Sequence, residues 1–149
     1  MAIPFTDQTL SPGAMADIHN QAFTRERPWT SEEFTLLIGQ PNTRSLSLNR
    51  SFAVGRLILG ELEILTLACA PSHQRQGNAF ALLSELLAIA SKEGGHSAFL
   101  EMAADNLAAK ALYNKLEFEL VGRRSDYYKR KDGIRCDALV LRKRLILSQ

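Results

Sequence analysis

The chain of 149 residues is 46% apolar and 23% charged, which is typical of one globular domain over residues 1–149 and excludes a largely disordered protein. It has no apolar run of the ~20 residues that span a membrane and no secretory signal, and Cys69 and Cys136 cannot form a disulfide scaffold, so we expect a cytoplasmic protein. The net charge is +2, but the charges are unevenly distributed, because residues 121–149 carry nine basic and three acidic side chains. Such a basic end can contact nucleic acid, a phosphorylated ligand or an acidic protein, or it can simply be exposed to solvent.

Two short helices are expected at the N-terminal end. Ser11 followed by Pro12 is typical of a helix start, with serine as the cap and proline in the first turn. Thr30 and Glu33 have the spacing of a capping box, which predicts a second helix. That helix should stop at Gly39, because glycine commonly follows the last turn of a helix.

The next segment has the patterns of strands. Ser45–Leu48 and Ser51–Leu59 are predicted as two strands, with Gly60 in the turn that follows. Leu62–Ala70 is almost continuously apolar, as expected of a strand that is buried on both faces. Pro71 should end this strand.

Asn78–Lys92 is the clearest predicted helix, because its apolar side chains recur at helical spacing and Gly94 and Gly95 follow it. The crossover through this helix requires the strands before and after it to be parallel. The sequence therefore predicts an α/β or α+β fold with a mixed sheet. The remaining predicted elements are a strand Ser97–Met102, a helix from Asp105 or Asn106 to about Leu116, and strands Phe118–Val121 and Ala138–Leu141.

The connection between the buried strand and the long helix is a candidate binding site. Gly77 and Ala79 near the helix start let a ligand approach the backbone closely. The free N–H groups of the first helical turn, together with the helix dipole, suit an anion such as a pyrophosphate. The alternative is a plain turn between strand and helix that contains one glycine.

Gln74, Gly77 and Ala79 fit the Gln/Arg-x-x-Gly-x-Gly/Ala signature of the GCN5-related N-acetyltransferase (GNAT) family, which this sequence resembles. A second block, residues 99–118, is similar to the second half of that family and is closest to the ribosomal-protein alanine N-acetyltransferases (RimI-like). The resemblance covers about residues 14–142. Further similarities to that subfamily are Pro28-Trp29-Thr30, Arg123-Arg124 and Tyr127-Tyr128.

The resemblance implies a mixed, mostly antiparallel sheet of about six or seven strands, with flanking helices and a splayed parallel strand pair. It also implies acetyl-CoA as co-substrate and no metal ion. By position, it assigns the general base to Glu101 and the general acid to Tyr113. The positions that it assigns to cofactor binding are Leu67, Ala68 and Cys69 on the strand, Arg75, Gln76, Gly77, Asn78, Ala79 and Phe80 in the loop and helix start, and Asn106.

The residues themselves support these roles unequally. Glu101 is a carboxylate within an apolar strand, so it needs a polar cleft, a partner or solvent, and a strand-end glutamate facing water is the alternative. Tyr113 has a phenol that is neutral near pH ~7 and can donate a proton, but its position also suits a packed helical tyrosine. Asn106 could be a helix cap alone. No metal site is expected, because the histidines are scattered and Cys69 has no second ligand pair.

Glu117 departs from the family pattern. The family usually has Leu-Gly-Phe after the second helix, and this chain has Leu116-Glu117-Phe118. A glycine there commonly takes the left-handed conformation that ends a helix, in which a glutamate costs ~1 kcal/mol or more. The exit of this helix, and with it the placing of Tyr113, is therefore open.

The expected reaction is direct transfer of an acetyl group from acetyl-CoA to a primary amine. An α-amine, with a pKa of ~8, loses its proton more easily than a lysine at ~10.4, so a carboxylate base such as Glu101 suits an α-amine better. The resemblance points to the N-terminal alanine of a small-subunit ribosomal protein, with no membrane and no direct nucleic-acid partner required.

Two other functions remain open at this point. One is acetylation of a small amine such as a polyamine or an antibiotic, and the other is a non-catalytic module that binds CoA or the ribosome. The basic stretch 123–131 can contact the 3′-phosphate of CoA, a ribosomal surface or nothing.

Overall fold

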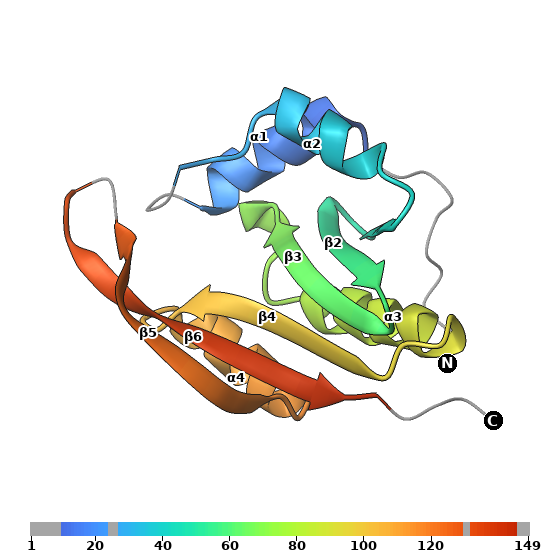
Figure 1. Cartoon of the computed structure of the whole chain (residues 1–149). Coiled ribbons are helices and arrows are strands. Elements are labelled where there is room, and N and C mark those ends of the chain that lie inside the picture. The colour runs from blue at the N-terminus through green and yellow to red at the C-terminus, as the bar shows by residue number, and fades with distance from the viewer. Residues whose placement is uncertain (1–9, 24–26, 130–131, 146–149) are drawn as a thin grey trace.

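The computed structural model describes residues 10–23, 27–129 and 132–145. The helices are α1 (Pro12–Ala22), α2 (Ser31–Ile38), α3 (Asn78–Lys92) and α4 (Leu107–Lys115), and a 3-10 turn, η1, covers Pro71–His73. The strands are β1 (Thr43–Ser47), β2 (Ser51–Ile58), β3 (Glu61–Cys69), β4 (Ser97–Ala103), β5 (Glu119–Lys129) and β6 (Arg135–Arg144). They form a six-stranded sheet in the order β1-β2-β3-β4-β6-β5, antiparallel throughout except between β3 and β4 (Figure 1). The predicted mixed fold is therefore confirmed.

The two N-terminal helices begin at the predicted caps. Ser11 Oγ accepts a hydrogen bond from the N–H of Ala14 (3.1 Å) at the start of α1. At α2, Thr30 Oγ1 accepts from the N–H of Glu33 (3.2 Å), and the Glu33 carboxylate accepts from the N–H of Thr30 (3.2 Å), which completes the capping box. Among the described residues, no helix is both long and apolar enough to cross a membrane.

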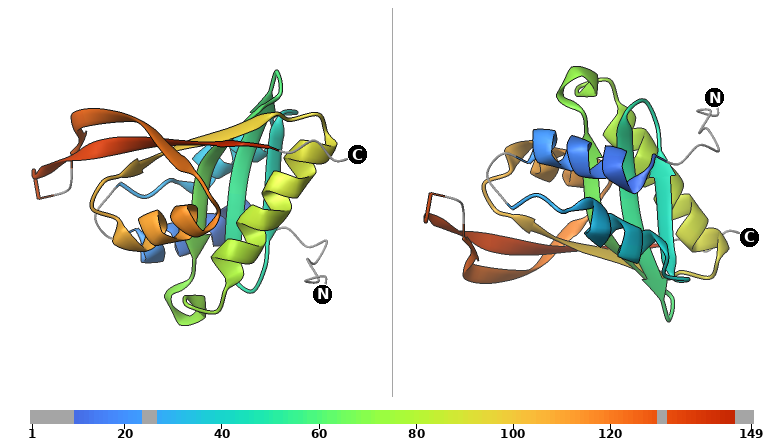
Figure 2. Two further views of the ribbon diagram at one scale, coloured as in Figure 1. Left: turned by 90° about the horizontal axis from the view of Figure 1, so that it is seen from below. Right: turned by 90° about the horizontal axis from the view of Figure 1, so that it is seen from above.

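Helices cover both faces of the sheet, each pair over its own apolar cluster. α1 and α2 lie on one face, and α3 and α4 lie on the other (Figure 2). Beneath α1 and α2, Met15, Ile18 and Phe34 pack with Phe52 and Val54 of β2. The larger cluster, beneath α3 and α4, includes Leu62, Leu82, Leu86, Leu100, Met102 and Tyr113. Truncating one such buried leucine to alanine typically costs ~2–5 kcal/mol, so these clusters fix the sheet between its two helical layers.

In the middle of β3, the alternation of its side chains between the two faces of the sheet shifts by one residue. Its register with β2 skips Leu65, which is therefore a β-bulge. Before the bulge, Ile64 packs in the cluster beneath α3, and after it Ala68 packs in the cluster beneath α1 and α2. In a regular strand both positions would face the same side. The bulge thus aims the second half of β3 differently from the first.

β3 and β4 start side by side and then separate. Their parallel register covers three pairs, from Glu61–Ser97 to Glu63–Phe99. Beyond these pairs β4 continues against β6 as far as Ala103, and β3 continues against β2. Figure 1 shows the two arrows diverging toward their carboxyl ends. This confirms the splayed parallel pair, and it leaves the second half of β3 with one edge that β4 does not cover.

The β5–β6 hairpin is longer than the sequence predicts. The strands expected over 118–121 and 138–141 have eleven and ten residues in the structure. Most side chains of β5 are exposed, so the apolar alternation that reveals a strand is missing from much of it. Polar contacts hold this region: Arg123 donates to Asp137 (2.7 Å), which also accepts from the backbone N–H of Asp126 (3.0 Å).

Glu117 takes the left-handed conformation, with a φ of +67°. The N–H of Phe118 donates to the carbonyl of Tyr113 (3.0 Å), and the N–H of Glu117 donates to the carbonyl of Asn114 (3.0 Å), as in a Schellman motif. The helix therefore ends in the same way as a helix that is followed by glycine. Only the residue type at position 117 differs from the family pattern.

Replacing Glu117 with glycine should raise the free energy of unfolding by ~0.5–1 kcal/mol. Glycine relieves the left-handed strain, and its greater freedom in the unfolded chain offsets part of that gain. Urea unfolding measures the difference. Glu117→Ala is the matched control, because it removes the 3.9 Å contact with Lys143 but keeps the strain. An alanine variant as stable as the glycine variant would contradict this explanation.

His19 ties α1 to the start of α2. Its Nδ1 accepts the backbone N–H of Trp29 (3.1 Å), which requires that nitrogen to be unprotonated. The ring is also stacked on the Trp29 indole, with 5.4 Å between the centroids. Burial, and secondly the charge of Arg27, lower the pKa of His19 from 6.5 to about 4.

The protein should lose stability as the pH falls from 6.5 toward about 4. In that window the unfolded chain takes up a proton at His19 that the folded protein excludes, whereas above it this contribution to stability is fully present. Thermal unfolding across the window measures the loss. In His19→Gln, which does not titrate, the melting temperature should depend less steeply on pH, and an equal slope in both proteins would refute the assignment.

Candidate active site

The loop between η1 and α3 is open, and no side chain caps the helix that follows it. Residues 74–77 are exposed, and Arg75 and Gly77 have left-handed φ values of +63° and +81°. Gly77 is the N-cap of the 15-residue α3 and supplies no side-chain hydrogen bond, whereas α1, α2 and α4 each have one. A β-carbon at Gly77 would meet no atom within 4 Å. The first-turn amides and the helix dipole are therefore available to an anion.

Side chains on both sides of the loop brace it. Asn78 Nδ2 donates to the carbonyl of His73 (3.0 Å), and Asn49 Nδ2 donates to Asn78 Oδ1 (3.3 Å). Gln74 Nε2 donates to the carbonyl of Cys69 (3.2 Å) at the end of β3. Asn78 is 5% exposed, and through these two hydrogen bonds its side chain braces the loop.

The strand that leads into the loop presents a backbone edge. Leu67, Ala68 and Cys69 pair with β2 on one side, and β4 has already parted from β3 after Glu63 on the other. The Ala68 side chain is buried, and that of Leu67 packs at the border of the larger cluster. Unpaired strand edges accept extended ligands by backbone hydrogen bonding.

Glu101 lies in the middle of β4 with an arginine beside it. Its neighbours Leu100 and Met102 pack beneath α3 and α4, so by strand alternation Glu101 faces the side of α1 and α2. Its side chain is 28% exposed, and Arg124 Nε of β5 is 3.6 Å from Oε2. The carboxylate is thus half-buried, paired with an arginine and directed toward the face of the sheet that α1 and α2 cover.

Tyr113 lies on the other side of β4. It is 6% exposed, packs in the cluster with Leu100 and Met102, and meets the Phe118 ring edge-on at 5.5 Å between centroids. Burial raises the pKa of its phenol to about 12. Glu101 and Tyr113 therefore flank β4 from opposite faces, on the strand that has separated from β3.

The remaining predicted cofactor residues are Ala79, Phe80 and Asn106, at the starts of α3 and α4. Ala79 and Phe80 are half-buried in the first turn of α3. Asn106 Oδ1 accepts from the N–H of Ala109 (3.1 Å), so this oxygen caps α4. The structure thus gathers the loop, the helix start and the end of β3, while Asn106 has the structural role that its sequence position also allowed.

The Acetyltransferase (GNAT) family profile matches residues 14–118, which include β3, the loop, α3, β4 and α4. The chain belongs to the GNAT family. This GNAT protein is 35% identical over 118 residues to the ribosomal protein bS18-alanine N-acetyltransferase of Escherichia coli strain K12, covering 76% of this chain and 79% of the relative. It is 30% identical over 123 residues to the N-alpha-acetyltransferase RimI of Mycobacterium tuberculosis, covering 76% of each. The crystal structure of the ribosomal-protein-S18-alanine N-acetyltransferase from Escherichia coli has a TM-score of 0.82 at 30% identity, covering 93% of this chain and 90% of that chain.

The family resemblance expected from the sequence is therefore confirmed. The GNAT protein is an N-acetyltransferase with acetyl-CoA as co-substrate. Acetyl-CoA consists of a diphosphate-bearing nucleotide and an extended pantetheine arm that ends in a thioester. The uncapped start of α3 fits the diphosphate, and the uncovered edge of β3 fits the extended arm.

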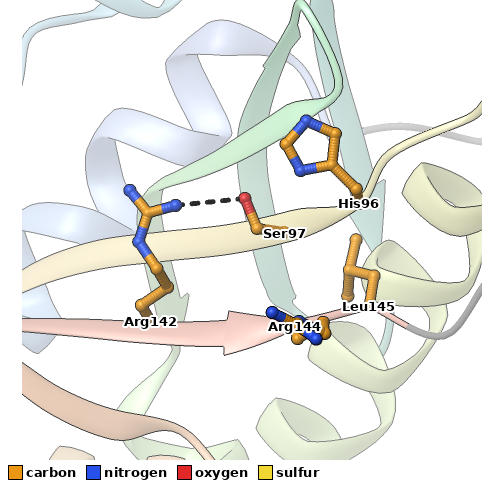
Figure 3. A pocket seen from close by; sticks show the side chains of 5 residues that line it. All are labelled: His96, Ser97, Arg142, Arg144 and Leu145. Carbon is orange, nitrogen blue, oxygen red and sulfur yellow. Dashed lines mark hydrogen bonds between the residues drawn. The ribbon is translucent and has the colours of Figure 1, made fainter.

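A separate hollow lies at the closed end of the parallel pair. It measures about 440 Å³ and is lined by His96, Ser97, Arg142, Arg144 and Leu145 (Figure 3). Arg142 Nη1 donates to Ser97 Oγ (3.2 Å), as the dashed line in Figure 3 marks. None of the predicted site residues lines this hollow. Across the described ranges, no group of three His, Cys, Asp or Glu side chains is placed to hold a metal ion.

Two contacts that shape the site cannot be predicted from a sequence pattern. Asn49 lies in the turn between β1 and β2, and only the folded sheet brings it to the α3 start. The Arg123-Arg124 pattern marks a similarity to the subfamily, but the partner of Arg124 depends on the length and register of β5. Since the strand prediction ended at 121, the pairing with Glu101 could not be foreseen.

Proposed function

We propose that this GNAT protein acetylates the α-amine of an N-terminal alanine, and that the acceptor is a small-subunit ribosomal protein. The observation that carries the proposal is its relatedness to ribosomal-protein alanine N-acetyltransferases over most of both chains. The half-buried carboxylate of Glu101 supports it, because an α-amine with a pKa of ~8 gives up its proton to such a base more easily than a lysine at ~10.4. We further propose a single domain over residues 1–149 and a cytoplasmic location.

The donor site consists of backbone groups. Amides of residues 75–79 bind the diphosphate at the start of α3, where no side chain caps the helix. The uncovered edge of β3 at residues 67–69 hydrogen-bonds the pantetheine arm, and a backbone N–H there polarises the thioester carbonyl. The arm is thereby directed along the gap between β3 and β4, toward the strand that carries Glu101.

The reaction is a direct transfer in one site. Glu101 accepts a proton from the acceptor amine, and the nitrogen attacks the thioester carbonyl carbon. The C–S bond then breaks, and the proton that the attacking nitrogen still has to lose goes to the departing thiolate. This gives the acetylated amine and CoA, and the proton on Glu101 returns to solvent. Holding both substrates in one cleft supplies much of the rate, because it replaces a bimolecular encounter.

Tyr113 completes the reaction on the leaving-group side. With a pKa of about 12, its phenol is protonated across neutral pH. A thiol has a pKa of ~8.5, so complete proton transfer from this phenol to the thiolate is uphill. We therefore assign Tyr113 the role of a hydrogen-bond donor that stabilises the departing thiolate, which takes its proton as CoA leaves.

Tyr113→Phe should lower kcat by ~10²-fold and change KM for acetyl-CoA little, because the hydrogen bond matters only as the thiolate forms. Thermal unfolding is the control for the loss of the hydroxyl. A variant with wild-type kcat would exclude Tyr113 from the reaction.

Release of CoA thiol from acetyl-CoA tests the function with four acceptors. They are a peptide that starts with alanine, its N-blocked form, a lysine peptide and spermidine. We expect turnover with the free alanine peptide and little with the others. Equal rates with free and blocked peptide would refute transfer to the α-amine, a preference for spermidine would favour a small-amine enzyme, and binding without turnover would favour a non-catalytic module.

A further inference from the structure

Lys115, in the last turn of α4, reaches the first turn of α3. Its Nζ lies 4.7 Å from the centroid of the Phe80 ring. Phe80 is half-buried and packs against the larger apolar cluster, so its ring is a fixed support for the lysine side chain. The ammonium group of Lys115 is therefore held close to the helix start at which the open loop ends.

Lys115 has no ion-pair partner among the described residues. In the part of the chain that the structure describes, no carboxylate lies within 4.0 Å of its Nζ. The basic hairpin differs, because Arg123 is paired with Asp137 (2.7 Å) and Arg124 with Glu101 (3.6 Å). These two arginines are engaged elsewhere, whereas Lys115, next to α3, has no counter-ion within residues 10–23, 27–129 and 132–145.

We propose that Lys115 binds the ribose 3′-phosphate of acetyl-CoA, and that the enzyme thereby distinguishes acetyl-CoA from its 3′-dephospho form. The inference rests on the proposed donor site, in which the amides of residues 75–79 hold the diphosphate. The third phosphate of CoA is carried by the adjoining ribose and is not part of that diphosphate contact. A lysine suits this task because its ammonium group is a compact charge that needs no fixed geometry.

The dissociation constants of acetyl-CoA and acetyl-3′-dephospho-CoA, measured by titration calorimetry, test this assignment. Lys115→Met should weaken binding of acetyl-CoA by about 5-fold, the size of a solvent-exposed charge interaction, and binding of the dephospho form by less than about 2-fold. Lys115→Arg should keep the wild-type difference between the dissociation constants of acetyl-CoA and its 3′-dephospho form. Lys110→Met is the matched control, because Lys110 is an exposed lysine of the same helix and should leave both constants unchanged.

The outcomes separate this inference from the donor site itself. Equal weakening of both donors in Lys115→Met, or weakening of neither, would overturn the assignment of Lys115. A wild-type protein that binds neither donor would instead overturn the proposed donor site. Thermal unfolding of each variant excludes a loss of binding through a loss of fold.

Discussion

Glu101→Gln should lower kcat for an alanine-terminated peptide by ~10²-fold or more, while KM for acetyl-CoA changes little. The amide keeps the size of the side chain but cannot accept the amine proton. The proposed donor site uses the start of α3 and the edge of β3, which this substitution does not touch. Steady-state kinetics with both substrates varied separate the two effects.

The control for Glu101 is Glu63→Gln. Glu63 lies on β3 within the closed part of the parallel pair, has a similarly half-exposed carboxylate, and is paired with an arginine, Arg56, at 2.6 Å. Both substitutions therefore break one arginine–glutamate pair. Wild-type kcat in Glu101→Gln, or an equal loss in Glu63→Gln, would show that Glu101 is not the base.

Gly77→Val should raise KM for acetyl-CoA by ~10²-fold, because a valine cannot hold the left-handed backbone that directs the loop amides, and each lost hydrogen bond to a charged group is worth ~1.5–3 kcal/mol. The space around Gly77 is open, so no clash within the protein contributes. The substitution should also lower the free energy of unfolding by ~1–2 kcal/mol through backbone strain.

Gly94→Val separates the two effects. Gly94 follows the other end of α3, has a φ of +88° against +81° at Gly77, and also has no atom within 4 Å of an added β-carbon. The strain, and the loss of stability, should therefore be similar in the two variants. KM for acetyl-CoA should rise in Gly77→Val alone, and a similar rise in both would mean that the loop amides do not hold the donor.

Several helices and strands could be predicted from the sequence because local interactions determine them. The Ser11 and Thr30 caps appear where side-chain oxygens can satisfy free amides, and the α3 pattern of apolar residues matches the face that it buries. The near-continuous apolar run of β3 also has a physical origin, because helices cover both faces of the sheet and successive β3 side chains pack in the two clusters.

The parts that could not be read from the sequence depend on distant partners. The second half of β5 is exposed and held by Asp137 and the register with β6, so it has no apolar period. The side chain of Asn78 is engaged by His73 and Asn49, and only the folded sheet brings Asn49 to this position. Glu117 looked like an obstacle to the helix exit, yet the Schellman hydrogen bonds hold it in the left-handed form.

Backbone amide shifts during titration of the ¹⁵N-labelled protein with acetyl-CoA test most directly whether the start of α3 holds the diphosphate. We expect the largest shifts at residues 75–79, followed by the edge of β3 at residues 67–69. Shifts centred on the hollow at His96 and Ser97, with residues 75–79 unmoved at saturation, would contradict the donor site from which the mechanism is built.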